Sequence, residues 1–87
     1  MTRAAPLATR SAQPAREILA LNLIRLRGER GWSQEALALE SGFHRTFIGH
    51  VERQGRNISL DNIERLATTL EVETYQLFVP HGKQSKT

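Results

Sequence analysis

The chain has 87 residues, no cysteine and a formal net charge of +3. This length suits one small domain and is too short for a doubly wound nucleotide-binding fold or a barrel enzyme, and the absence of cysteine excludes disulfides and thiolate metal sites. No apolar run approaches the roughly 18 residues of a membrane span, and no continuous apolar stretch follows the N-terminal arginines as in a secretory signal, so we expect a cytoplasmic protein without membrane contact.

The two ends of the chain differ in composition from its middle. Residues 1–16 contain three arginines, two prolines and no acid, with few large apolar side chains. Because such a segment cannot offset the entropy lost on ordering, we predict a flexible basic arm there and a flexible polar tail over 80–87. The folded domain is expected over 17–79, where seven arginines stand against nine acids, so the basic excess belongs to the ends.

Apolar residues in the middle of the chain recur at helical spacing, and no window alternates as a half-buried strand would. The spacing and the capping residues predict helices over 16–30, 34–41, 45–53 and 60–70, followed by a final turn that Thr74 caps. The apolar positions that we expect to face inward on these helices are Leu19, Leu23, Leu26, Leu37, Ala38, Phe47, Ile48, Val51, Leu60, Ile63, Leu66, Ala67 and Leu70. We therefore predict an all-α, compact domain of five helices.

The second and third predicted helices form the most informative segment. Ser33 is a good N-cap for the second helix, small Ala38 permits a close crossing of the two helices, and Gly42 permits the positive φ that a tight turn requires. Two short helices joined by such a turn have the layout of a helix-turn-helix.

The pieces around this segment resemble the Xre-like, phage-repressor-type helix-turn-helix family over roughly residues 18–79. They are Leu26-Arg27, Arg30-Gly31-Trp32-Ser33-Gln34-Glu35, Leu37-Ala38, Gly42, His44-Arg45-Thr46-Phe47-Ile48, Val51-Glu52-Arg53, Arg56-Asn57, Ser59-Leu60 and the run from Ile63 to Leu70. The resemblance implies a five-helix domain that binds operator DNA, usually as a symmetric dimer. The small size is similar to that of restriction–modification controller proteins and compact prophage repressors.

The outward face of the third helix is the predicted reading surface. With Ile48 and Val51 inward, the opposite face carries donors and small residues and no acid: Arg45, Thr46, Gly49, His50 and Arg53. An arginine such as Arg45 can contact guanine in bidentate fashion, a threonine such as Thr46 can meet a thymine methyl, and His50 can donate to a base. Gly49 would let the helix backbone lie close to the groove. The alternative is an ordinary solvated helix face.

A second group of residues is predicted to contact the DNA backbone: Ser33, Gln34, His44, Arg53, Arg56 and Asn57. Gln34 stands at the first position of the second helix, where the helix dipole favours an anion, and the resemblance implies that it holds a phosphate. Backbone contacts of this kind fix the register of a protein on DNA and make its binding depend on salt.

Other positions receive structural roles. The resemblance pairs Arg27 with Glu52 as an internal salt bridge between the first and third helices. Leu77, Phe78 and Val79 are the predicted apolar contact of a dimer, and the alternative is that they close the core of the monomer. A core role for Leu77 would still leave Phe78 or Val79 to face a partner. The family's glycine after Glu-Arg arrives one residue late, at Gly55, so we expect the exit of the third helix to shift by one residue.

Catalysis and metal binding find no support in these residues. The three histidines lack metal-ligand spacing, and the carboxylates fall at polar helix positions. We expect no cofactor, no metal, no small-molecule ligand and no enzymatic activity. The predicted function is a sequence-specific regulator that binds double-stranded DNA, an inverted-repeat operator, as a homodimer. The alternative is an antitoxin-type interaction protein that binds a toxin and its own promoter.

Overall fold

A computed structural model of the protein describes residues 14–55 and 57–81. These residues contain helices and no strand: α1 (Ala15–Glu29), α2 (Gln34–Ser41), α3 (Arg45–Glu52), α4 (Leu60–Leu70) and the 3₁₀ helix η2 (Thr74–Phe78). The all-α prediction is confirmed, but the count of five α-helices is wrong, since the last element is a 3₁₀ helix. Extended backbone at Val79 and then Pro80 leave η2 only five residues, and 3₁₀ helices occur in such short pieces.

The predicted boundaries differ from the observed ones by one residue at most. The bounds of α2 and α4 are as predicted, and α3 ends one residue early. Helix α1 begins one residue early, so the last two residues of the predicted arm are helical. The rest of the arm, and the tail beyond His81, lie outside the described residues. The cap of the last turn is Glu73 and not Thr74, because the side chain of Gln76 accepts a hydrogen bond of 2.8 Å from the Glu73 backbone N–H in a capping box.

All four α-helices end in the same way, with a left-handed residue just beyond the last turn. In α1 and α2 this residue is glycine, Gly31 with φ 73° and Gly42 with φ 81°. In α3 and α4 it is not glycine, since Gln54 has φ 64° and Glu71 has φ 61°. The sharp reversals that result keep the connections short, and they bring each helix back against its neighbours.

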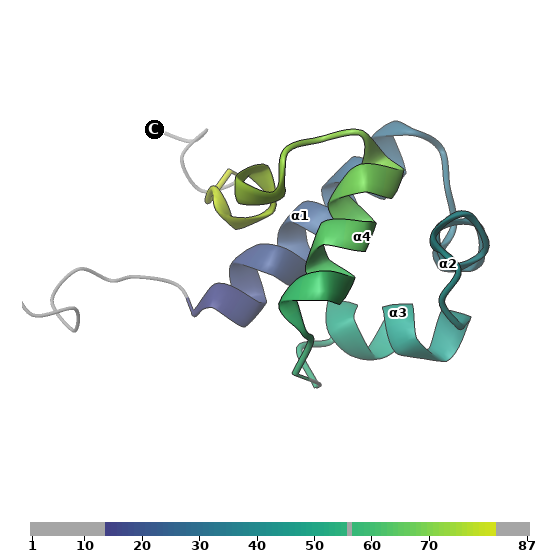
Figure 1. The fold of residues 1–87 in the computed structure, drawn as a ribbon, viewed down its shortest axis with the longest axis horizontal. Coiled ribbons are helices and arrows are strands. Elements are labelled where there is room, and N and C mark those ends of the chain that lie inside the picture. Colours follow the sequence, from purple (N-terminus) through teal and green to yellow (C-terminus); the bar gives the residue numbers. More distant parts are fainter. Residues whose placement is uncertain (1–13, 56, 82–87) are drawn as a thin grey trace, which may run out of the picture.

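The hydrophobic core collects one fully buried large side chain from each element, namely Leu23, Leu37, Ile48, Leu66 and Leu77. The predicted core position at Leu60 is wrong, because this first residue of α4 is 77% exposed. In Figure 1, α2 and α3 lie at one end of the bundle, η2 lies at the other end, and α1 and α4 run between them. Burying side chains from every element in one core fixes the relative positions of α2 and α3, on which the candidate site depends.

The end of η2 is tied to α1 by a buried amide. The side chain of Asn22, which is 2% exposed, donates to the carbonyl oxygens of Leu77 at 2.8 Å and Val79 at 3.0 Å. These bonds give the last carbonyls of a short 3₁₀ helix the partners that a continuing helix would have supplied. A polar residue inserted among the apolar positions of α1 is the signal in the sequence from which this tie could have been predicted.

Candidate nucleic-acid interface

The α2–turn–α3 unit is held by local contacts that follow from its sequence. The hydroxyl of Ser33 accepts from the backbone N–H of Ala36 at 3.0 Å and caps α2. At the other end, the N–H of Phe43 donates to the carbonyl of Ala38 at 2.9 Å across Gly42. Ala38 is itself 3% exposed, as expected for a small residue where two helices pack closely.

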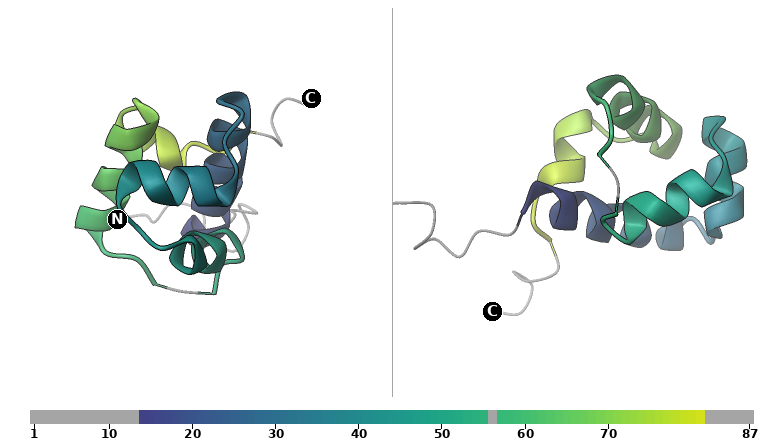
Figure 2. Two further views of the ribbon diagram at one scale, coloured as in Figure 1. Left: turned by 90° about the vertical axis from the view of Figure 1, so that its right-hand side faces the viewer. Right: turned by 90° about the horizontal axis from the view of Figure 1, so that it is seen from below.

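The outer face of α3 carries most of the predicted base-reading side chains. Arg45, Thr46 and Arg53 are exposed, and His50 is half-buried. Seen from below in Figure 2, α3 lies on the near side of the molecule, and no other described helix covers its outer face. Gly49 is predicted to lie open on this face, but it is buried, because the side chains of Arg53 and Gln34 lie over it.

Three helices meet at the carboxylate of Glu52, which is 4% exposed. Its two oxygens accept from Nε of Arg27 at 2.7 Å and from Nη2 at 2.9 Å, in a bidentate ion pair. The amide nitrogen of Gln34 donates to the same carboxylate at 2.9 Å. Since Arg27 belongs to α1, Gln34 to α2 and Glu52 to α3, these bonds fix how the helix-turn-helix sits on the rest of the domain.

The electrostatics of this cluster keep Arg27 cationic. Its hydrogen bonds to Glu52 raise the pKa of Arg27 above its ordinary value, burial works in the opposite direction, and the negative charge of Glu52 adds to the rise. The remaining donor, Nη1, binds the carbonyl of Trp32 at 3.1 Å. The only acid of α3 is therefore neutralised inside the protein, and it adds no free negative charge to the outer face.

The residues predicted to contact phosphate differ in whether their side chains already form hydrogen bonds within the protein. The hydroxyl of Ser33 is engaged in the helix cap, and the amide nitrogen of Gln34 is engaged by Glu52. His44 occupies the N-cap position of α3 without a side-chain cap hydrogen bond, and it is exposed. Arg56 lies outside the described residues.

The exit of α3 is not shifted as the late glycine predicts. The N–H of Gln54 donates to the carbonyl of Val51 at 3.0 Å, and the N–H of Gly55 donates to that of His50 at 2.9 Å. These two bonds form a Schellman motif, whose left-handed position is Gln54. The helix thus ends where the family pattern places its end, and a glutamine takes the strained conformation that glycine usually adopts.

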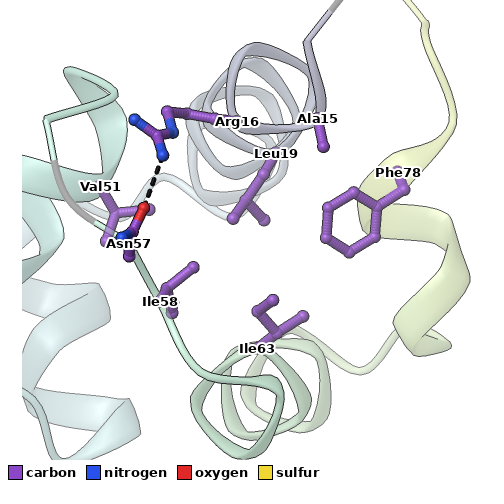
Figure 3. A pocket seen from close by; sticks show the side chains of 8 residues that line it. All are labelled: Ala15, Arg16, Leu19, Val51, Asn57, Ile58, Ile63 and Phe78. Carbon is purple, nitrogen blue, oxygen red and sulfur yellow. Dashed lines mark hydrogen bonds between the residues drawn. The ribbon is translucent and has the colours of Figure 1, made fainter.

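The loop between α3 and α4 is attached to the first turn of α1. Nη2 of Arg16 donates to Oδ1 of Asn57 at 2.5 Å, and Figure 3 shows this bond at the rim of an apolar pocket of about 340 Å³. Leu19, Ile63 and Phe78 are among the residues that line it. Arg16 stands where the predicted arm meets the predicted first helix, and its link to Asn57 has no signal in the sequence, because 41 residues separate the two.

The three residues predicted as a dimer contact differ in how deeply they are buried. Leu77 is fully buried, so it is not part of a dimer contact, and the alternative holds in which Leu77 closes the core of the monomer. Phe78 is half-buried and lines the pocket, whereas Val79 is 44% exposed. Leu21 and Ile24 on α1 are also exposed, at 49% and 41%, and they flank Asn22, which binds the Val79 carbonyl.

The described residues contain neither a cluster of metal-ligand side chains nor a helix that could span a membrane. Over 14–55 and 57–81, no group of three or more histidine, cysteine or acidic residues could hold a metal ion. Within the same part of the chain, no helix has the length and apolar character needed to cross a membrane.

Comparison with known proteins places this geometry in a family. The sequence matches the helix-turn-helix family over residues 23–77. The solved structure of a hypothetical transcription factor from Neisseria has a TM-score of 0.78 to this chain at 44% identity, covering 85% of each chain. The control protein C.SmaI from Serratia marcescens is 41% identical over 71 residues, which are 82% of this chain and 84% of that protein.

A further solved structure holds nucleic acid. The restriction-modification controller protein C.Esp1396I, solved as a tetramer in complex with its natural 35 base-pair operator, has a TM-score of 0.68 at 30% identity, over 77% of this chain and 88% of that one. The family match spans more than half of the 87 residues, and it contains the whole α2–turn–α3 unit. This chain belongs to the helix-turn-helix family.

Proposed function

We propose that this protein is a sequence-specific, DNA-binding transcription regulator that reads an inverted-repeat operator as a homodimer. In this proposal α3 enters the major groove, α2 and the α3–α4 loop contact the flanking backbone, and the two copies of α3 read half-sites about one helical turn apart. Its similarity to controller proteins, one of them solved on its operator, supports the same class of regulator for this chain.

The observation that carries the proposal is the composition of the uncovered face of α3. Arg45, Thr46 and Arg53 are exposed there, whereas the single acid of the helix, Glu52, is buried and paired. An α-helix with its side chains is about 10–12 Å across, so α3 can enter a major groove about 12 Å wide. We assign base contacts to Arg45, Thr46 and His50, with Arg45 as the main reader because its guanidinium can bind guanine O6 and N7 together.

The backbone contacts are proposed for residues around this face. His44 and Arg53 are exposed at the two ends of α3, and Asn57 is exposed in the loop that follows. Ser33 and Gln34 lie at the start of α2, where backbone N–H groups and the helix dipole favour a phosphate, and Arg56 follows the recognition helix in the sequence. These contacts would position the protein and carry little sequence information.

We propose the dimer contact at Val79, together with Phe78 and the exposed apolar residues of α1. Val79 is the most exposed of the three C-terminal candidates that the sequence offers. Leu21 and Ile24 lie on the helix to which the Val79 carbonyl is bound. Exposed apolar side chains of this size are typical of surfaces that another protein covers when they form one patch.

The test is a titration of Arg45 variants against two duplexes, the one most enriched by selection from random DNA and a scrambled duplex. Arg45→Ala is expected to weaken binding to the selected duplex by about 1–3 kcal/mol and binding to the scrambled duplex far less. Arg45→Lys is the matched control, because it keeps the charge and removes the planar fork, so it should lose specificity and retain the salt dependence. Equal losses on both duplexes would contradict the role of Arg45 as a base reader.

A further inference from the structure

Gly49 occupies an unexpected position in the candidate interface. It lies in α3, on the side that carries the predicted DNA contacts, and yet it is buried. The side chains over it are those of Arg53 and Gln34: a Cβ at Gly49 would lie 3.2 Å from Nη1 and 3.7 Å from Nη2 of Arg53, and 3.6 Å from Oε1 of Gln34. The guanidinium of Arg53 therefore lies across the bare backbone of α3, beside the first residue of α2.

The helix geometry explains this arrangement. A helical side chain leans toward the N-terminus, over the residue four positions before it, and for Arg53 that residue is Gly49. A Cβ there would lie 3.2 Å from Nη1, a tight contact, so the end of the Arg53 side chain would have to shift by a few tenths of an ångström from its place against the helix. Gln34 bounds the other side of the same space, and its amide nitrogen is held at 2.9 Å by the buried Glu52.

We propose that Gly49 is a positioning residue of the DNA interface, which seats the guanidinium of Arg53 against α3 so that it is already oriented for the DNA backbone. This inference rests on the proposed function. A long arginine side chain has much rotamer freedom to lose on binding, and a seat formed by Gly49 and Gln34 restricts that freedom before DNA arrives. Gly49 then acts through Arg53 and makes no contact with the DNA itself.

A glycine inside a helix lowers the stability of that helix, and this loss supports a role for Gly49 other than stability. Glycine destabilises a helix interior relative to alanine, so Gly49→Ala should stabilise α3 while it weakens DNA binding. The chain offers a matched control, because Gly28 lies in α1 with nothing within 4 Å of a Cβ. Gly28→Ala makes the same chemical change in a helix but displaces no side chain.

The experiment is a double-mutant cycle of Gly49→Ala and Arg53→Ala, measured as affinity for the selected duplex at one salt concentration. Ordering one long side chain costs about 0.5–1.5 kcal/mol on association, which corresponds to a loss of about two- to tenfold. We expect Gly49→Ala to cause that loss when Arg53 is present and no loss in the Arg53→Ala background. Gly28→Ala should leave the affinity unchanged.

Two results would overturn the proposal. An equal loss in both backgrounds would mean that Gly49 makes room for the DNA itself, and no loss in either would mean that the seat does not matter for binding. A readout of Arg53 accompanies the cycle: Arg53→Ala should reduce the slope of log K against log salt by about 0.9, as expected for one lost phosphate contact. An unchanged slope would show that the seated group is not a backbone contact.

A second measurement needs no DNA and separates this inference from the proposed function. In thermal unfolding, Gly49→Ala should stabilise the Arg53→Ala variant as much as Gly28→Ala stabilises the wild type. It should stabilise the protein that retains Arg53 less, because there it displaces the seated guanidinium. Equal stabilisation in both backgrounds would show that no seat exists. If the wild-type protein prefers no duplex, the proposed function fails, and the unfolding cycle still decides whether Arg53 is seated.

Discussion

Replacing Glu52 by glutamine perturbs the point at which three helices are joined. The wild-type carboxylate accepts hydrogen bonds from Nε and Nη2 of Arg27 and from the amide of Gln34. In Glu52→Gln, one of the two terminal atoms becomes an NH₂ group that cannot accept. At the Oε2 position this group would face the Nε donor of Arg27, and at the Oε1 position it would face donors of both Arg27 and Gln34. Arg27 also loses its counter-ion, although its side chain is only 19% exposed.

The expected magnitude follows from this burial. Removing one partner of a buried ion pair typically costs about 3–5 kcal/mol, and we take the lower end, about 3 kcal/mol, because water still reaches part of Arg27. A domain of this size rarely has more than about 3–5 kcal/mol of core stability. At about 4–8 °C per kcal/mol, the melting temperature should fall by about 12–24 °C.

The assay is thermal unfolding followed by circular dichroism, at equal protein concentrations. The matched control is Glu29→Gln, which breaks the exposed pair of Glu29 with Arg25, 3.1 Å long and one helical turn apart. An exposed pair of this kind contributes less than about 0.5 kcal/mol, so this control should unfold close to the wild type. If Glu52→Gln unfolded at the temperature of Glu29→Gln, the joint at Glu52 would not stabilise the fold as described.

Two further predictions concern the exit of α3 and the dimer contact. Gln54→Gly should raise the stability of the fold by about 1 kcal/mol, because it relieves the φ of 64° at that residue. Thermal unfolding measures this change, and Gly42→Ala is expected to change the stability in the opposite sense. A destabilised Gln54→Gly protein would refute the strain at Gln54. Val79→Asp should remain folded, because Val79 is 44% exposed, and it should sediment as a monomer. The control is Leu39→Asp, at a residue of α2 that is 79% exposed, and this variant should stay dimeric. A dimeric Val79→Asp protein would reject the contact at Val79.

The fold could be predicted largely from local signals in the sequence. The N-caps at Ser33 and Ser59 accept the hydrogen bonds that were predicted for them, and for that reason the starts of α2 and α4 are correct. Errors arose where a local pattern has two solutions. A five-residue turn before Pro80 can be α or 3₁₀, and Gln54 can take a left-handed conformation when the two hydrogen bonds of the Schellman motif hold it.

The site was less predictable because spacing does not determine side-chain paths. The sequence pattern assigns Gly49 to the outer face of α3, but it cannot show that Arg53 folds back over it. Likewise, a prediction from composition cannot separate Leu77, which packs into the core, from Val79, which does not. The pairing of Arg27 with Glu52 came from a family resemblance, and the participation of Gln34 became visible only in the folded structure.

The most direct test of the central claim is the selection of bound sequences from random double-stranded DNA with the wild-type protein. We expect enrichment of an inverted repeat whose half-sites lie about one helical turn apart, with a conserved guanine in each half-site that Arg45→Ala no longer selects. Recovery of random sequence, or of a motif that Arg45→Ala selects unchanged, would contradict the assignment of α3 as the recognition helix.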